Sequence, residues 1–182
     1  MAAKKRMIGK VHPAVISVWA ALVAVSALLP AVPIFGGGVM SVATCLTPLA
    51  GVFFGAIPGA LAAGIGRFIG QMIAPASGGF GMWTFTISLV SGLAAGLTWN
   101  GKWWMAPALC LAMVGLWFTH PIGQKTPIFP IVFHGSGFVT SLFSALVGKK
   151  WLVGKNVLLK SVAVFLICYS GTVIGACLAN WY

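Results

Sequence analysis

The chain of 182 residues contains eleven Lys and Arg residues and no Asp or Glu, which gives it a net charge of +11 at pH 7. Apolar residues make up 60% of the sequence and charged residues 6%, and the mean hydropathy is +1.05. This composition excludes an ordinary soluble domain and predicts an integral membrane protein. Without side-chain carboxylates, paired-carboxylate hydrolysis, Asp or Glu proton relays and an Asp-supported serine triad are also excluded.

The basic residues and the cysteines suggest neither nucleic-acid binding nor a metal site. Lys and Arg lie at the ends of apolar segments, without a basic helix, a set of zinc ligands or an aromatic RNA-binding motif. We therefore expect no nucleic-acid partner. Cys45, Cys110, Cys168 and Cys177 lack metal-ligand spacing and are interpreted as small buried hydrophobic residues, so no metal or cofactor is expected.

The chain begins with a short basic head over residues 1–13, followed by an apolar run over about 14–35. A secretory signal peptide also begins in this way. The run is nevertheless long enough to cross a bilayer and has no clear small-x-small cleavage site after it. We interpret it as the first membrane span, and Pro30, Pro33 and the glycines at 36–38 predict an irregular loop after it.

Apolar segments separated by Gly/Pro-rich or basic connections continue to the end of the chain. They predict a single all-α transmembrane domain over 1–182, built as a bundle of six to seven helices. Two of the segments are short: at a helical rise of about 1.5 Å per residue, each would be about 25 Å long. It therefore stays open whether both cross the membrane fully. The predicted spans are about 14–35, 40–56, 58–74, 82–98, 103–119, 128–147 and 156–180, of which the second and third are the short ones.

The distribution of charge predicts the orientation. With a cytoplasmic N-terminus and seven crossings, nine basic residues fall inside and two, Arg67 and Lys125, fall outside. This asymmetry agrees with the positive-inside rule, and anionic lipid is the expected partner of the cytoplasmic charges. Tryptophans around Lys102 would anchor that interface. The sequence therefore predicts a multi-pass protein of the cell membrane with its N-terminus in the cytoplasm.

Arg67 is a charge at a depth where a bilayer disfavours one, which makes it a candidate functional residue. It lies about seven residues, or roughly 10 Å, below the outer end of its segment, and Gln71 follows one turn later on the same face. His134 has a similar expected depth in the segment over 128–147. No carboxylate side chain in the sequence can neutralise Arg67.

These polar residues predict a pocket that opens to the outside and suits a ligand with an anionic group and a flat or apolar body. Its expected lining is Arg67, Gln71, Trp83, Trp117, His120, Gln124, Lys125 and His134. Ordinary alternatives stay open. Arg67 could extend to lipid phosphate or pair with the terminal carboxylate of Tyr182, His134 could bond a carbonyl, and His120 could simply end a helix.

Small residues at four-residue spacing predict close helix packing. The pairs are Ala20 with Ala24, Gly55 with Gly59, Gly66 with Gly70, Gly92 with Gly96, and Gly171 with Gly175. Packing within the chain is the ordinary interpretation of each pair. The alanine pair of the first segment is also a candidate contact for another protein.

The basic head, the AALVA sequence at Ala20–Ala24, the PAVPIFGGG loop and the segment GVFFGAIPGALAAGIGRFIGQM resemble the substrate-binding (S) components of energy-coupling factor transporters. The resemblance covers roughly residues 14–100. It implies a non-enzymatic prokaryotic subunit that captures a vitamin or micronutrient beneath a loop lid. Ala20 and Ala24 would then dock on a coupling transmembrane subunit. ATPase subunits would supply the energy, because this chain has no P-loop.

Two features depart from that family, namely the seventh segment and the complete lack of acidic residues. The second feature favours an anionic or neutral substrate. A different class of function fits both departures: an accessory or structural subunit of a larger membrane complex, in which Arg67 meets a carboxylate of another chain. A membrane enzyme that uses His120 or His134 as a base is less favoured, since no metal site or orienting carboxylate accompanies them.

Overall fold

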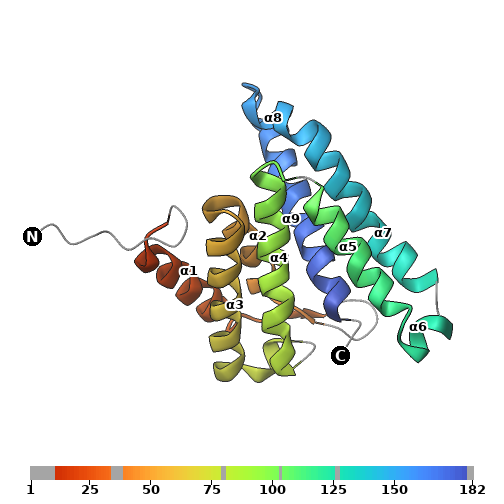
Figure 1. Ribbon diagram of the computed structural model, residues 1–182. Helices are drawn as coiled ribbons and strands as arrows, with labels where there is room; N and C mark the ends of the chain where they lie inside the picture. The colour runs from red at the N-terminus through yellow and green to blue at the C-terminus, as the bar shows by residue number, and fades with distance from the viewer. Residues whose placement is uncertain (1–10, 34–38, 79–80, 103, 126–127, 180–182) are drawn as a thin grey trace, which may run out of the picture.

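The protein is a helical bundle in the computed structural model, which describes residues 11–33, 39–78, 81–102, 104–125 and 128–179 (Figure 1). The predicted all-α class is confirmed. The helices are α1 (Pro13–Ser26), α2 (Ala43–Phe54), α3 (Ala56–Ile73), α4 (Thr84–Trp99), α5 (Met105–Trp117), α6 (Pro121–Lys125), α7 (Ile128–Phe143), α8 (Lys149–Val153) and α9 (Val157–Ala179). Shorter elements are the strands β1 (Val32–Pro33) and β2 (Val39–Met40), the 3-10 turns η1 (Pro75–Ser77) and η2 (Gly81–Trp83), and the π turn η3 (Ser144–Gly148).

In the part of the chain that the structure describes, three stretches of helix are long and apolar enough to cross a membrane: Ala56–Ile73, Gly81–Trp99 and Val157–Leu178. The surface carries many exposed apolar side chains, such as Val18 at 70% exposure, and a bilayer would cover them. These features support a location in a membrane. α1, α2 and α5 are apolar but shorter, so crossing by all seven predicted segments stays a prediction.

The boundaries of the first two spans differ from those expected. α1 ends at Ser26 instead of continuing to about residue 35, because Pro30 and Pro33 cannot continue the hydrogen-bond pattern of a helix. The loop expected to be irregular contains an antiparallel pair in which Val32 lies opposite Met40. α2 and α3 are separated at Gly55, whose φ of 87° strongly favours glycine.

The helices form two groups that α9 joins (Figure 1). α3 packs against α1, α2 and α4, and α4 then packs against α9. On its other side α9 contacts α7, which in turn packs against α5. α4 and α9 therefore lie between α3 and α7.

Small residues build these contacts, as the sequence predicts. A Cβ atom on Gly66 would lie 2.4 Å from the carbonyl oxygen of Ala20, and one on Gly175 would lie 2.6 Å from that of Ile87. The backbones of α3 and α1, and of α9 and α4, approach this closely because no side chain intervenes. Ala20 and Ala24 are thus buried against α3. Their predicted contact with a coupling subunit stays a prediction, and their burial leaves little of either residue open to such a partner.

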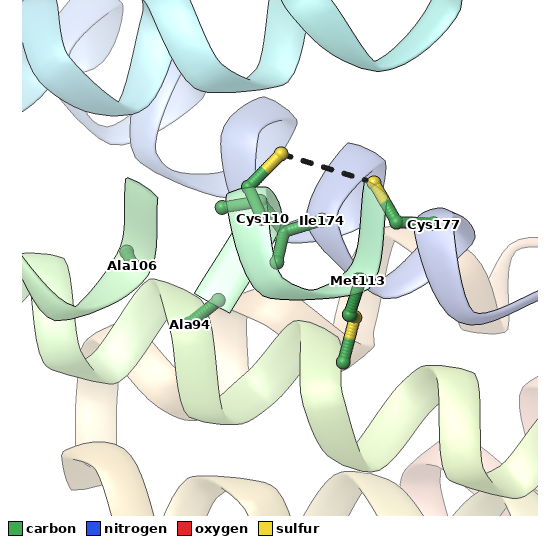
Figure 2. Packing of buried hydrophobic residues seen from close by; sticks show 6 residues of the cluster. All are labelled: Ala94, Ala106, Cys110, Met113, Ile174 and Cys177. Carbon is green, nitrogen blue, oxygen red and sulfur yellow. Dashed lines mark hydrogen bonds between the residues drawn. The ribbon is translucent and has the colours of Figure 1, made fainter. Parts of the chain in front are cut away.

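A cluster of buried apolar residues lies where α4, α5 and α9 meet (Figure 2). It includes Cys110 and Cys177, whose sulfur atoms are 3.9 Å apart and form no disulfide. These two cysteines are buried hydrophobic residues as expected. Cys168 is half-buried and Cys45 is exposed, so the expectation of burial is wrong for Cys45. The described residues hold no group of three or more potential metal ligands.

The close contact between α1 and α3 can be tested by adding one methyl group. We expect Gly66→Ala to destabilise the protein by about 1–3 kcal/mol, since the new methyl group would collide with the backbone of α1. Gly115→Ala is the matched control, because nothing lies within 4 Å of its Cβ position. It should be neutral or stabilising by up to ~1 kcal/mol. Unfolding midpoints in detergent would measure both effects, and equal midpoints would contradict the packing.

Candidate functional site

Arg67 lies on α3 and turns into the protein. Only 3% of the residue is exposed, and its guanidinium group makes two hydrogen bonds. Nη1 donates to Ser41 Oγ at 2.8 Å, and Nη2 donates to the backbone oxygen of Ser77 at 2.6 Å. An arginine that extended to lipid phosphate would expose its head group. The structure therefore corrects that alternative.

Neither partner of Arg67 carries a charge. The sequence has no Asp or Glu, and the carboxylate of Tyr182 lies outside the described residues. Burial of an ion without a counter-charge costs several kcal/mol even after the protein relaxes, and neutral hydrogen bonds recover only part of that. The site is thus electrostatically suited to an anion that arrives from outside the chain.

Gln71 lies one helical turn after Arg67 on the same face and is 1% exposed. Within the described part of the chain, both its Oε1 and its Nε2 lack a hydrogen-bond partner, and so does the buried hydroxyl of Ser77. Each such group destabilises a folded protein by about 1–3 kcal/mol. The face of α3 that carries the charge therefore also carries unused donors and acceptors.

Three separate segments bring these groups together at the end of α3. Ser41 directly follows β2, Ser77 ends η1, and Thr84 begins α4. Thr84 Oγ1 donates to the carbonyl of Gly81 at 3.0 Å and so has a partner. We call this set the Arg67 cluster and define it as Ser41, Arg67, Gln71, Ser77, Gly78 and Thr84.

The remaining predicted site residues do not join Arg67 and Gln71 in one pocket. Trp83 is 56% exposed at the end of η2, and Gln124 and Lys125 are exposed on α6. His120 stacks on Trp117, with 6.0 Å between the ring centroids. These positions do not form the single outward pocket that the sequence predicts.

His134 is buried on α7, and the backbone oxygen of His134 lies 3.9 Å from Cys110 Sγ on α5. α4 and α9 separate this region from α3 (Figure 1). A similar depth in the bilayer therefore does not bring His134 to Arg67, because the two helices lie on different sides of the bundle. The predicted set is divided. Arg67 and Gln71 are together, and Trp83 directly precedes Thr84 of the cluster but is exposed, whereas the residues from Trp117 to His134 lie apart.

Two apolar hollows flank α3, and neither reaches the Arg67 cluster. One, of about 360 Å³, lies between α1 and α3 around Ala21 and Ile69; the other, of about 310 Å³, lies between α3 and α4 around Phe68 and Phe85. Both are lined almost wholly by apolar atoms. They face the surface that a bilayer would cover, so the polar cluster is a closed site separate from them.

Sequence reasoning missed Ser41, Ser77, Gly78 and Thr84. Ser77 and Gly78 belong to the PASGGFG stretch, whose glycines and proline indicate only a turn. Ser41 follows a glycine-rich loop more than twenty residues before Arg67. Small polar residues of this kind are frequent in loops, so no sequence signal distinguishes them before the helices are placed.

The hydrogen bond from Arg67 to Ser41 gives a direct test of the cluster. We expect Ser41→Ala to lower the free energy of unfolding by about 1.5–3 kcal/mol, because the bond involves a charged, buried donor. Ser17→Ala is the control: its hydroxyl donates to the carbonyl of Pro13 at an exposed position and should contribute little. Denaturant unfolding in detergent would compare the two variants. If both variants lost the same small amount of unfolding free energy, the contact between Arg67 and Ser41 would be weak.

Comparison with known proteins matched no family model, no curated protein and no solved structure. Function is therefore argued from the geometry and chemistry of the Arg67 cluster. That geometry consists of a buried cation with two neutral partners, a carboxamide and a hydroxyl without partners, and a cover made by segments on either side of α3 in the sequence.

Proposed function

We propose that this protein is a membrane-embedded subunit that captures a small anionic or neutral molecule for uptake. The observation that carries the proposal is the buried guanidinium of Arg67, which no side chain of the sequence can neutralise because it holds no Asp or Glu. Burial in a medium of low dielectric strengthens the attraction between a cation and an anion. An anionic group that replaces the carbonyl of Ser77 as a partner would therefore bind favourably.

The location of the cluster fits capture from outside the cell. Figure 1 places α8 and the connection from α4 to α5 at one end of the bundle, and the end of α3 and α6 at the other. The first end carries Lys102 and Lys150, whereas the second carries Lys125. With the basic head expected in the cytoplasm, the positive-inside rule assigns the Arg67 cluster to the outer side.

The resemblance to S components suggests the partners. A coupling transmembrane subunit and ATPase subunits would use ATP to drive release of the substrate on the inner side. Because Ala20 and Ala24 pack against α3, contact with a coupling subunit would have to use exposed neighbours on α1, such as Val18, Leu22 and Val25. These three side chains lie at the spacing of one helical stripe.

The alternative is an accessory subunit whose Arg67 pairs with a carboxylate of another membrane chain. The lack of acidic residues in this chain favours it. However, Arg67 is almost fully covered by its own chain, through Ser41 and Ser77. A side chain on a neighbouring helix could not reach it without opening the bundle, whereas a small molecule needs only a local displacement of the cover.

Replacement of Arg67 tests this function. Wild-type protein purified from its native membrane should carry a small anion close to one per chain, and Arg67→Gln should reduce that content at least tenfold. The expected loss follows because removing one partner of a buried charged pair costs about 2–5 kcal/mol. Mass spectrometry of the released small molecules and of the accompanying chains would measure it.

Lys102→Gln is the control, since it removes an exposed charge at the opposite end of the bundle and should leave the anion content unchanged. Arg67→Lys provides a second variant that keeps the charge but loses the two-point geometry of the guanidinium. Wild-type protein without a bound anion, accompanied by a constant set of other membrane chains, would contradict capture and support the accessory function.

A further inference from the structure

Gln71 has a carboxamide that packing alone does not explain. Both of its polar atoms are buried without a hydrogen-bond partner among the described residues. Folded proteins leave few such groups, because each loses its bonds to water and gains none in return. A methionine would fill nearly the same volume without this loss. A ligand that bonds the carboxamide would account for a glutamine at this position.

Gly78 makes room for that carboxamide. A Cβ atom at position 78 would lie 2.0 Å from Gln71 Nε2 and 2.7 Å from Thr84 Oγ1. The amide therefore packs directly beneath the backbone of Gly78, next to the carbonyl of Ser77 that accepts from Arg67. A single short segment, Ser77–Gly78, covers both side chains. A ligand would reach them only after a displacement of this segment.

The two side chains present different chemistry at a defined separation. Arg67 offers a positive charge, whereas Gln71 offers a neutral N–H donor beside a C=O acceptor. Residues four apart on a helix have Cβ atoms about 5–6 Å apart. A simple inorganic anion could accept hydrogen bonds from Arg67 and from Gln71 Nε2, but it would offer no donor to Gln71 Oε1. A molecule with an anion at one end and a complementary N–H and C=O edge at the other would satisfy both.

We propose that the Arg67 cluster binds a small molecule with an anionic group and an amide-like edge, such as a carboxamide, lactam or imide. Arg67 holds the anionic group, Gln71 pairs with the edge, and the hydroxyl of Ser77 supplies a further hydrogen bond. This inference rests on the proposed function, because it names the substrate class of the same site. It assigns Gln71 as the residue that determines specificity.

The test uses two pairs of carboxylates that differ in the amide-like edge. Orotate has an imide edge and benzoate is a flat carboxylate without one; succinamate has a carboxamide and 4-methylpentanoate has the same shape without it. The unfolding midpoint of the full chain in detergent is measured against the concentration of each probe. In at least one pair, the amide-bearing member should produce a given rise in the unfolding midpoint at a concentration at least tenfold lower than the other member requires.

Two variants separate the roles of the side chains. Gln71→Met should remove the difference within the pair and leave the effect of the plain carboxylate, whereas Arg67→Gln should remove the stabilisation by all four probes. The inference would be overturned if both members of each pair stabilised the protein at the same concentration. It would also be overturned if no probe shifted the unfolding midpoint. The proposed function fails by a different result, namely native protein that carries no bound small molecule.

A measurement without any probe separates binding from a structural role. Gln71→Met should raise the unfolding midpoint of the probe-free protein, because it removes two buried groups that have no partner. Thr98→Val is the comparison, since it removes a buried hydroxyl that donates to the carbonyl of Ala94 at 3.0 Å, and it should lower the midpoint. A lower midpoint for Gln71→Met would show that the glutamine stabilises the fold and would overturn its assignment to a ligand.

Discussion

A buried positive charge without a side-chain carboxylate to neutralise it is the constraint on which the site depends. Arg67 is held by a hydroxyl and a carbonyl, which orient the guanidinium but leave its charge in place. In a soluble protein, a nearby Asp or Glu would supply the counter-charge. Here the sequence contains neither. The same lack of acidic residues that restricts catalysis therefore leaves the cluster suited to anion binding.

Small residues place that charge where it is. Gly66 and Gly70 bring α3 against α1, and the residues that follow each of them, Arg67 and Gln71, face the segments around Ser41 and Ser77. One helix therefore uses adjacent faces for two tasks. Its glycine face removes side chains so that backbones approach, and its polar face is covered by turns instead of by another helix.

The bundle compensates for a costly site with ordinary apolar packing elsewhere. The cluster around Cys110 and Cys177 is remote from Arg67, on the far side of α4, and it contains only apolar side chains and thiols (Figure 2). This apolar cluster is thus separate from the polar site. This separation is common in proteins that retain unfavourable groups for function. His134 on α7 and His120 between α5 and α6 lie in the other group of helices, so they take no part in the Arg67 cluster.

The sequence by itself determined the all-α class, the positions of the apolar helices and the shared face of Arg67 and Gln71. Composition and hydropathy indicate helices because a bilayer requires each backbone group to bond within its own segment, and a period of about 3.6 residues places i and i+4 together. Only the tertiary structure decided that Ala20 faces inward, that His134 lies beyond α4 and α9, and that Ser41 and Ser77 hold Arg67. Spacing along a helix determines depth and face, whereas the neighbour that each face meets depends on how all the helices pack at once.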